Sequence, residues 1–164
     1  MAFPEDLLEQ AHYLAQREPR RPKQASLRRA VSTAYYAIFH LLIGETVLNW
    51  KRPSERDTLA RMFEHKKMRD ACIQKRDELN AYFNSNPRAG SSMTAARHLL
   101  IVAETFVKRQ QDRHSADYDN SVRWTRTEVI ARIESVRGAF QSWGAIRETE
   151  MAHDFLVRLL LRER

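Results

Sequence analysis

The segment Arg109–Asp119 (RQQDRHSADYD) holds the densest group of residues that could do chemistry. It contains two arginines, one histidine, one tyrosine and three aspartates. Histidine can take or give a proton near neutral pH, and arginine can hold a phosphate and offset charge in a transition state. Together they suit RNA cleavage without a metal. A loop fixed by side-chain hydrogen bonds, with Asp117 or Asp119 capping a turn, explains the same residues.

A second group is basic. The segment 17–26 (REPRRPKQAS) contains two prolines that end any helix before it, and its cations are Arg17, Arg20, Arg21 and Lys23. It predicts either a loop that contacts nucleic-acid phosphates or a solvated connector. The whole chain carries a net charge of +7 and has a pI near 9.9, which favours an anionic partner such as RNA. The other interpretation of this charge is a solvated helical surface rich in arginine.

Several classes of site are missing from the sequence. There is no glycine-rich phosphate loop, Cys72 is the single cysteine, and the six histidines form no His-Glu-x-x-His pair. We therefore expect neither a metal nor a cofactor. The N-terminus lacks the pattern of a signal peptide, and no apolar run approaches the roughly 18 residues of a membrane span. We expect a cytoplasmic protein with no membrane partner.

The best helix pattern lies over residues 28–42. Small and apolar residues recur there at helical spacing, together with three aromatic rings and the imidazole of His40. A stripe this apolar should be buried on both sides, so we expect this helix at the centre of the fold. Its aromatic residues are interpreted as core. His40 is the exception, since it could point toward a cleft and support Arg113.

The remaining periodicity predicts an all-α, up-and-down bundle of four to six helices in one domain, 1–164, with its core over 4–145. Ser54 and Asp57 resemble a capping box for the third helix, and Thr125 and Glu128 form one for the fifth. Loops are expected over 80–92 and 113–121. The expected helices cover about 4–17, 24–48 (interrupted late by Gly44), a segment that begins after Ser54 and whose apolar spacing fades after Ile73, 93 to near 113, 125 onward (with a kink at Gly144) and 147–162.

Two motifs resemble the HEPN-domain family. The segment 29–40 (RAVSTAYYAIFH) resembles the second helix of these proteins, and 113–119 (RHSADYD) resembles the Arg-x-x-Ala-Asp-Tyr segment of one bacterial branch. The resemblance covers about residues 4–145. It implies a helical bundle that pairs as a homodimer. Many members are metal-independent ribonucleases that act as toxins or defence effectors. The resemblance also suggests a nucleotidyltransferase antitoxin as partner.

The family's nuclease signature is an arginine followed, after four to six residues, by a histidine in a cleft between two protomers. Five positions after Arg113 this chain has Tyr118, whereas Arg109 and His114 keep the spacing one helical turn upstream. We expect Arg113 to hold phosphate, His114 to act as acid or base, and Asp117 and Tyr118 to position them. Arg109 and His40 are secondary candidates. The alternatives are an inactive HEPN module that binds RNA or nucleotide or partners a nucleotidyltransferase, and a dimeric helical scaffold.

Overall fold

The computed structural model describes residues 2–87 and 92–161, and within these ranges the chain is helical and contains no strand. The all-α prediction is therefore confirmed. The described residues form seven α-helices, because the expected third helix is divided in two. The elements are α1 (Ala2–Gln16), α2 (Gln24–Leu48), the 3₁₀ turn η1 (Pro53–Glu55), α3 (Arg56–Ala60), α4 (His65–Ser85), α5 (Ser92–Tyr118), α6 (Arg126–Ile146) and α7 (Glu150–Arg158).

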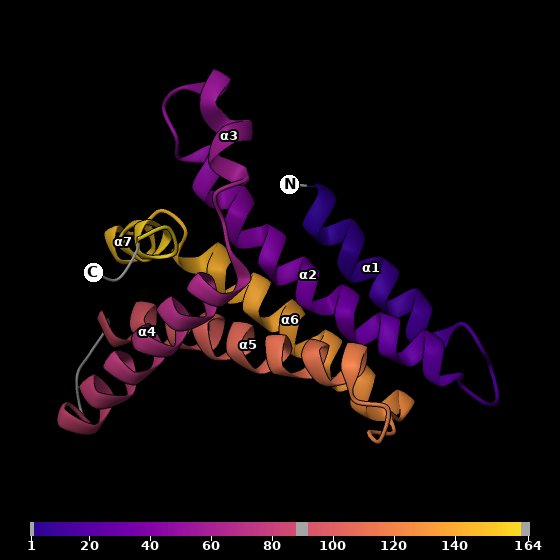
Figure 1. Cartoon of the computed structure of the whole chain (residues 1–164). Helices are drawn as coiled ribbons and strands as arrows, with labels where there is room; N and C mark the ends of the chain where they lie inside the picture. The colour runs from indigo at the N-terminus through magenta and orange to yellow at the C-terminus, as the bar shows by residue number, and fades with distance from the viewer. Residues whose placement is uncertain (1, 88–91, 162–164) are drawn as a thin grey trace.

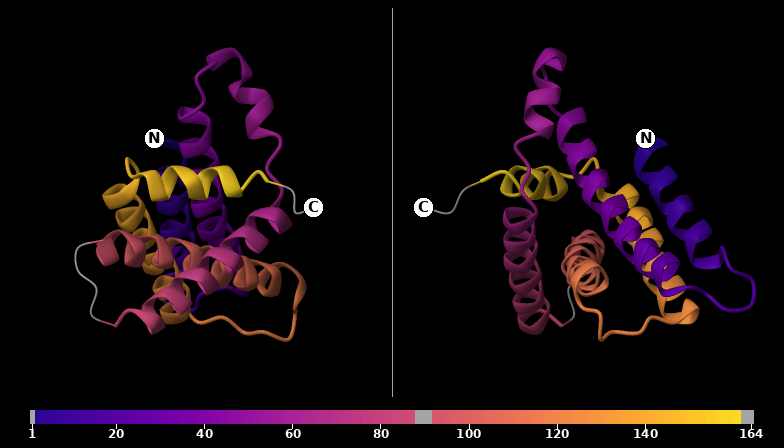
Figure 2. Two further views of the ribbon diagram at one scale, coloured as in Figure 1. Left: turned by 90° about the vertical axis from the view of Figure 1, so that its left-hand side faces the viewer. Right: turned by 45° about the vertical axis from the view of Figure 1, so that its right-hand side comes forward.

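The helices pack around α2. α1 and α2 form an antiparallel hairpin, α6 lies along them, and α5 crosses this group with α4 on its outer side (Figure 1). α7 lies across one end of the bundle, and η1 with α3 extends beyond the other helices at the C-terminal end of α2 (Figure 2). One continuous apolar cluster includes residues of α1, α2, α4, α5, α6 and α7, so the bundle shares a single core.

The predicted central position of α2 is confirmed, since most of its residues are buried and it contacts α1, α5 and α6. The helix runs through Gly44, which does not interrupt it. Its length and composition also meet those of a membrane span, although most of its apolar stretch is buried inside the bundle. A core helix of a bundle has the same properties.

The expected third helix is wrong in its start and its continuity. Ser54 lies inside η1, α3 covers only five residues, and α4 begins at His65. The chain folds back because Arg56 donates hydrogen bonds to the carbonyls of Leu48 and Trp50, at 3.3 and 3.1 Å. Trp50 in turn donates from Nε1 to Glu55, at 2.8 Å.

The next two boundaries also differ from the sequence prediction. α4 continues to Ser85, so the first part of the expected loop 80–92 is helical, and residues 88–91 lie outside the described part. α5 continues to Tyr118 instead of ending near Arg113. The reason is Arg28 of α2, whose guanidinium donates to three carbonyls at the end of α5 and just after it. The acceptors are those of Ala116, Asp119 and Val122, at 2.8, 2.9 and 2.5 Å.

We expect Arg28→Met to lower the free energy of unfolding by about 1–3 kcal/mol, because three carbonyls lose a charged donor. Amides of residues 114–118 should exchange faster with deuterium in this variant. Urea unfolding and hydrogen exchange measure the two effects. Arg29→Met is the matched control, since Arg29 is the exposed neighbour of Arg28. Equal stability of the two variants would contradict this account of the α5 end.

The last two helices start at threonine caps. The predicted capping box of α6 is confirmed: the Glu128 amide donates to Thr125 Oγ1 at 3.2 Å, and the Thr125 amide donates to Glu128 Oε2 at 2.9 Å. α6 runs through Gly144 without a break. α7 begins after Thr149, whose hydroxyl accepts from the Ala152 amide, and ends at Arg158. It is therefore shorter than the expected 147–162, of which residue 162 lies outside the described part.

Candidate functional site

Arg113 lies where α5 crosses α2. Its Nη2 donates a hydrogen bond to the hydroxyl of Tyr36 at 2.9 Å, and its Nε is 3.2 Å from Asp117 Oδ2. The guanidinium carbon stands 5.5 Å from the ring centre of Tyr36 and 5.9 Å from that of Tyr35. Burial opposes the charge of Arg113, but the hydrogen bond and negative potential of Tyr36, with Asp117, outweigh it and raise the pKa. Arg113 is thus a fixed cation against an aromatic surface.

Asp117 holds one edge of this cation. It follows Arg113 by one helical turn, so the ion pair exists only because α5 continues past Arg113. Ser32 of α2 donates its hydroxyl to the other carboxylate oxygen. The expected positioning role of Asp117 therefore has a structural basis, and the remaining edge of Arg113 is the part that could receive a ligand.

Arg113, Tyr35, Tyr36 and Asp117 form one cluster, called here the Arg113 cluster. His65, at the start of α4, also belongs to it and is the member that could not be predicted from the sequence. Its ring stacks on Phe39 with centres 4.1 Å apart, and its Nδ1 lies 2.6 Å from the hydroxyl oxygen of Tyr35. The ring centre of Tyr36 is 6.0 Å away. Burial, followed by the charges of Arg113 and His40, lowers the pKa of His65 below its ordinary value of 6.5. The imidazole is therefore neutral at pH 7.

The lowered pKa of His65 predicts a pH dependence of stability. Burial lowers the pKa of His40 as well. The unfolded chain therefore binds more protons than the folded chain once the pH falls below about 6.5, and acid favours unfolding. We expect the free energy of unfolding to have its highest value above pH 7 and to decrease as the pH falls toward 5.5. Urea unfolding at both values measures this loss, which should shrink in the double variant His40→Gln/His65→Gln. An equal loss in the double variant would contradict the assignment.

His40 lies beside the cluster. Its ring centre is 6.4 Å from that of Tyr36 and 5.0 Å from that of Phe3 in α1. In the described part of the chain, no hydrogen bond or ring contact joins it to Arg113 directly. Tyr36, which contacts the His40 ring and accepts a hydrogen bond from Arg113, links the two residues indirectly.

His114 and Tyr118 occupy a different face of α5. Their ring centres are 5.1 Å apart, both side chains are exposed, and Tyr118 is 67% exposed. Among the described residues, no hydrogen bond, ion pair or ring contact joins either one to Arg113. Within the chain, the expected site is therefore divided in two: Arg113 with Asp117 lies against α2, and His114 with Tyr118 forms an exposed pair on another face of α5.

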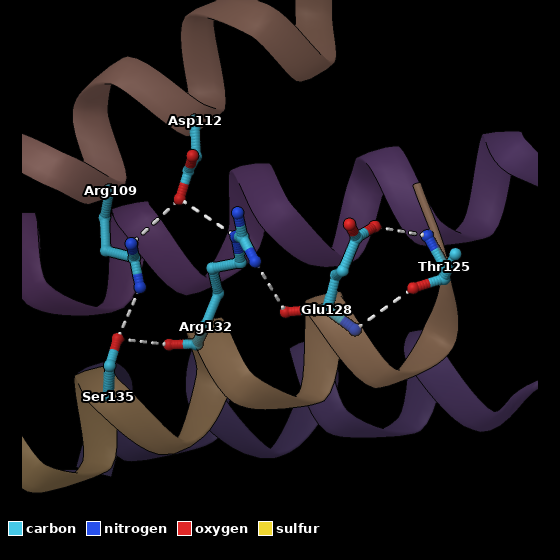
Figure 3. A network of polar contacts seen from close by, with 6 residues as sticks. All are labelled: Arg109, Asp112, Thr125, Glu128, Arg132 and Ser135. Atoms are coloured by element: carbon cyan, nitrogen blue, oxygen red, sulfur yellow. Dashed lines mark hydrogen bonds and ion pairs between the residues drawn. The ribbon is translucent and has the colours of Figure 1, made fainter. Parts of the chain in front are cut away.

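Arg109 is part of the packing between α5 and α6. Its Nε is 3.0 Å from Asp112, its Nη1 donates to Ser135 Oγ at 2.5 Å, and Arg132 shares the same carboxylate at 3.3 Å (Figure 3). Burial lowers its pKa from the ordinary value. Although Arg109 and His114 have the family's spacing, the structure does not bring them together, because Arg109 faces α6 and His114 is exposed.

The four cations of the segment 17–23 are all exposed. Arg126 fixes this segment by donating to the carbonyls of Ala15 and Pro19, at 3.0 and 3.3 Å, and to that of Glu18. Gln24 exchanges two hydrogen bonds with the backbone of Trp124, at 2.8 and 2.9 Å. The basic segment therefore lies at the same end of the bundle as the connection from α5 to α6 (Figure 1).

Comparison with protein-family models, with curated proteins and with solved structures found no match. The described residues also include no group of three or more His, Cys, Asp or Glu side chains arranged to hold a metal ion. What the site offers chemically is an arginine fork, a phenol and an imidazole in contact, with a second imidazole exposed on the next face of α5.

Proposed function

We propose that the protein is a HEPN-like, metal-independent endoribonuclease that acts as a homodimer. The observation that carries the proposal is the Arg113 cluster. Arg113 is held as a cation by Tyr36 and Asp117, and its side chain keeps 20% exposure at the crossing of α5 and α2. A planar guanidinium with a free edge binds the oxygens of a phosphodiester and offsets the charge that develops on them.

The proposed dimer supplies the acid and the base. His114 of one copy takes the proton of the ribose 2′-hydroxyl, and the 2′ oxygen attacks phosphorus. The bond from phosphorus to the 5′ oxygen breaks, and His114 of the second copy gives its proton to that oxygen. The exposure of His114 and Tyr118 supports this arrangement, because a second copy or an RNA can reach them.

The same proposal gives the biological setting. A ribonuclease of this kind acts in the cytoplasm as a toxin or defence effector, and a nucleotidyltransferase antitoxin is the partner that the family resemblance suggests. The motifs over 29–40 and 113–119 support this setting.

Digestion of RNA in EDTA tests the proposed activity. We expect cleavage by the wild type and a loss of about 10²-fold or more in His114→Ala, which removes the acid and base. Lys108→Ala, another exposed residue of α5, is the control and should keep full activity. Undiminished cleavage by His114→Ala would remove His114 from the mechanism.

The second candidate function is RNA binding without cleavage. Two observations favour it: Asp117 already pairs with Arg113, and tyrosine stands five positions after this arginine, where the family's active members have histidine. Salt-sensitive RNA binding by the wild type, without cleavage in EDTA, is the result that this candidate predicts.

The basic segment should contribute phosphate contacts under either candidate. We expect the double variant Arg20→Ala/Arg21→Ala to bind single-stranded RNA more weakly. The slope of log affinity against log salt should fall in magnitude by about 1.4, since each phosphate contact contributes about 0.7 for single strands. Fluorescence anisotropy at several salt concentrations measures this slope. The control is the double variant Lys108→Ala/Arg137→Ala, which should keep the slope of the wild type. If Arg20→Ala/Arg21→Ala also keeps that slope, the segment 17–23 is a solvated connector.

A further inference from the structure

We propose that Tyr35 holds the neutral imidazole of His65 with its proton on Nε2, so that His65 donates a hydrogen bond to the same phosphate that Arg113 holds. Tyr35 is then a positioning residue, and His65 is a ligand-binding donor rather than a base. The inference rests on the proposed function for the identity of the phosphate as part of an RNA.

The first step is the direction of the hydrogen bond between Tyr35 and His65. Tyr35 is fully buried, with 0% exposure, and the one hydrogen-bond partner of its hydroxyl among the described residues is His65 Nδ1, at 2.6 Å. A buried hydroxyl hydrogen needs an acceptor. Burial also raises the pKa of Tyr35 far above its ordinary value, so the phenol keeps its proton. Tyr35 therefore donates and Nδ1 accepts.

The second step is the tautomer. A neutral imidazole whose Nδ1 accepts a hydrogen bond carries its hydrogen on Nε2. The opposite tautomer would donate from Nδ1 to Tyr35 and leave the buried phenol hydrogen without an acceptor. In the described part of the chain, the titratable groups that contact or act on His65 are Tyr35, Tyr36 and His40 from α2 and Arg113 from α5. Burial, followed by the charges of Arg113 and His40, disfavours the protonated imidazole, so its neutral form is maintained.

The third step is the fixed position of the ring. Phe39 stacks on it at an interplanar angle of 20°, and Gln110 of α5 donates to the backbone carbonyl of His65 at 3.2 Å. No hydrogen bond in the described part of the chain uses Nε2. The donor therefore stays in place without a protein acceptor, beside the aromatic surface on which Arg113 lies.

In this proposal three donors of different kinds serve one anion, because Tyr36 lies beside the other two: its ring centre is 6.0 Å from that of His65 and 5.5 Å from the guanidinium carbon of Arg113. Arg113 offers its remaining N–H groups, and His65 offers Nε2–H. The hydroxyl of Tyr36 accepts from Arg113, so its own hydrogen is left to donate. Donors fixed before the ligand arrives stabilise a phosphate and the charge that develops on it during cleavage.

Nitrogen-15 NMR of the histidine side chains, at pH 7.5 and without RNA, tests the tautomer. We expect the wild type to show His65 with an unprotonated Nδ1 and a protonated Nε2, and Tyr35→Phe to show a mixture of tautomers. Tyr13→Phe, an exposed tyrosine of α1, is the control and should leave His65 unchanged. A protonated Nδ1 in the wild type, or an unchanged tautomer in Tyr35→Phe, would overturn the inference.

Titration with inorganic phosphate tests the donor role separately from RNA chemistry. The Nε2–H signal of His65 should shift in the wild type and stay unchanged in Arg113→Ala. RNA affinity should fall about tenfold in His65→Phe, the loss expected for one hydrogen bond to a charged group. A phosphate response without RNA binding would reject the proposed function and keep the anion site. No phosphate response, with the expected tautomer, would reject the donor role itself.

Discussion

Arg113→Ala is expected to lower RNA cleavage by about 10²–10³-fold, the usual effect of removing one charge-stabilising donor from an active site. The variant loses the cation that would hold the phosphate, together with the hydrogen bond to Tyr36 and the ion pair to Asp117. RNA affinity should fall in parallel, because the lost contact is made to the phosphate before and during the reaction. Initial rates and anisotropy titrations measure the two effects.

Two further variants separate the site from the fold. Arg113→Ala removes the ion-pair partner of Asp117, although Ser32 still donates to that carboxylate, and the double variant Arg113→Ala/Asp117→Ala removes both charges and should still lack cleavage. Arg113→Lys keeps a charge but loses the planar fork, and we expect it to remain well below the wild type. Arg137→Ala, on the exposed side of α6, should be fully active. Normal cleavage by the double variant would show that Arg113 has no part in the reaction.

Phe106→Ala is expected to lower the free energy of unfolding by about 3–5 kcal/mol, as large-to-small changes in packed cores do. Phe106 is fully buried in α5, and its ring meets that of Tyr35 edge-on with centres 5.5 Å apart. This loss is a large fraction of the roughly 5–15 kcal/mol that stabilises a typical domain. The cavity also removes support from Tyr35, so the tautomer of His65 should become mixed in this variant.

Ile101→Ala provides the comparison in the same helix. Ile101 is 42% exposed, so its truncation should cost less than about 1 kcal/mol. Urea unfolding of both variants, followed by circular dichroism, gives the difference. Similar losses for Phe106 and Ile101 would mean that the packing of α5 against α2 differs from the structure described.

Features of the fold that depend on local signals could be predicted from the sequence. The capping box of Thr125 and Glu128 lies within four residues and defines the start of α6. The apolar stripe over 28–42 is periodic over several turns and correctly indicates a buried helix at the centre of the bundle. In both cases the residues that determine the structure are neighbours along the chain.

Features that depend on distant partners could not be predicted in the same way. α5 extends past Arg113 because Arg28, 88 to 94 residues from its carbonyl acceptors, satisfies the end of the helix. His65 joins the site through Tyr35 and Phe39, and no spacing in the sequence marks that contact. Ser54 has the residue type of a helix cap, but the contacts of Arg56 with the end of α2 turn the chain there instead.

We propose that this bundle cleaves RNA at a phosphate held by Arg113. The most direct test is to incubate the wild-type protein with a defined RNA in EDTA and to identify the new ends by mass spectrometry. We predict 2′,3′-cyclic phosphate and 5′-hydroxyl ends, because the 2′ oxygen is the nucleophile and the 5′ oxygen leaves. The same ends should be absent with Arg113→Ala. Intact RNA would contradict the proposed cleavage: salt-dependent binding would then leave the RNA-binding candidate, and no binding would leave a helical scaffold.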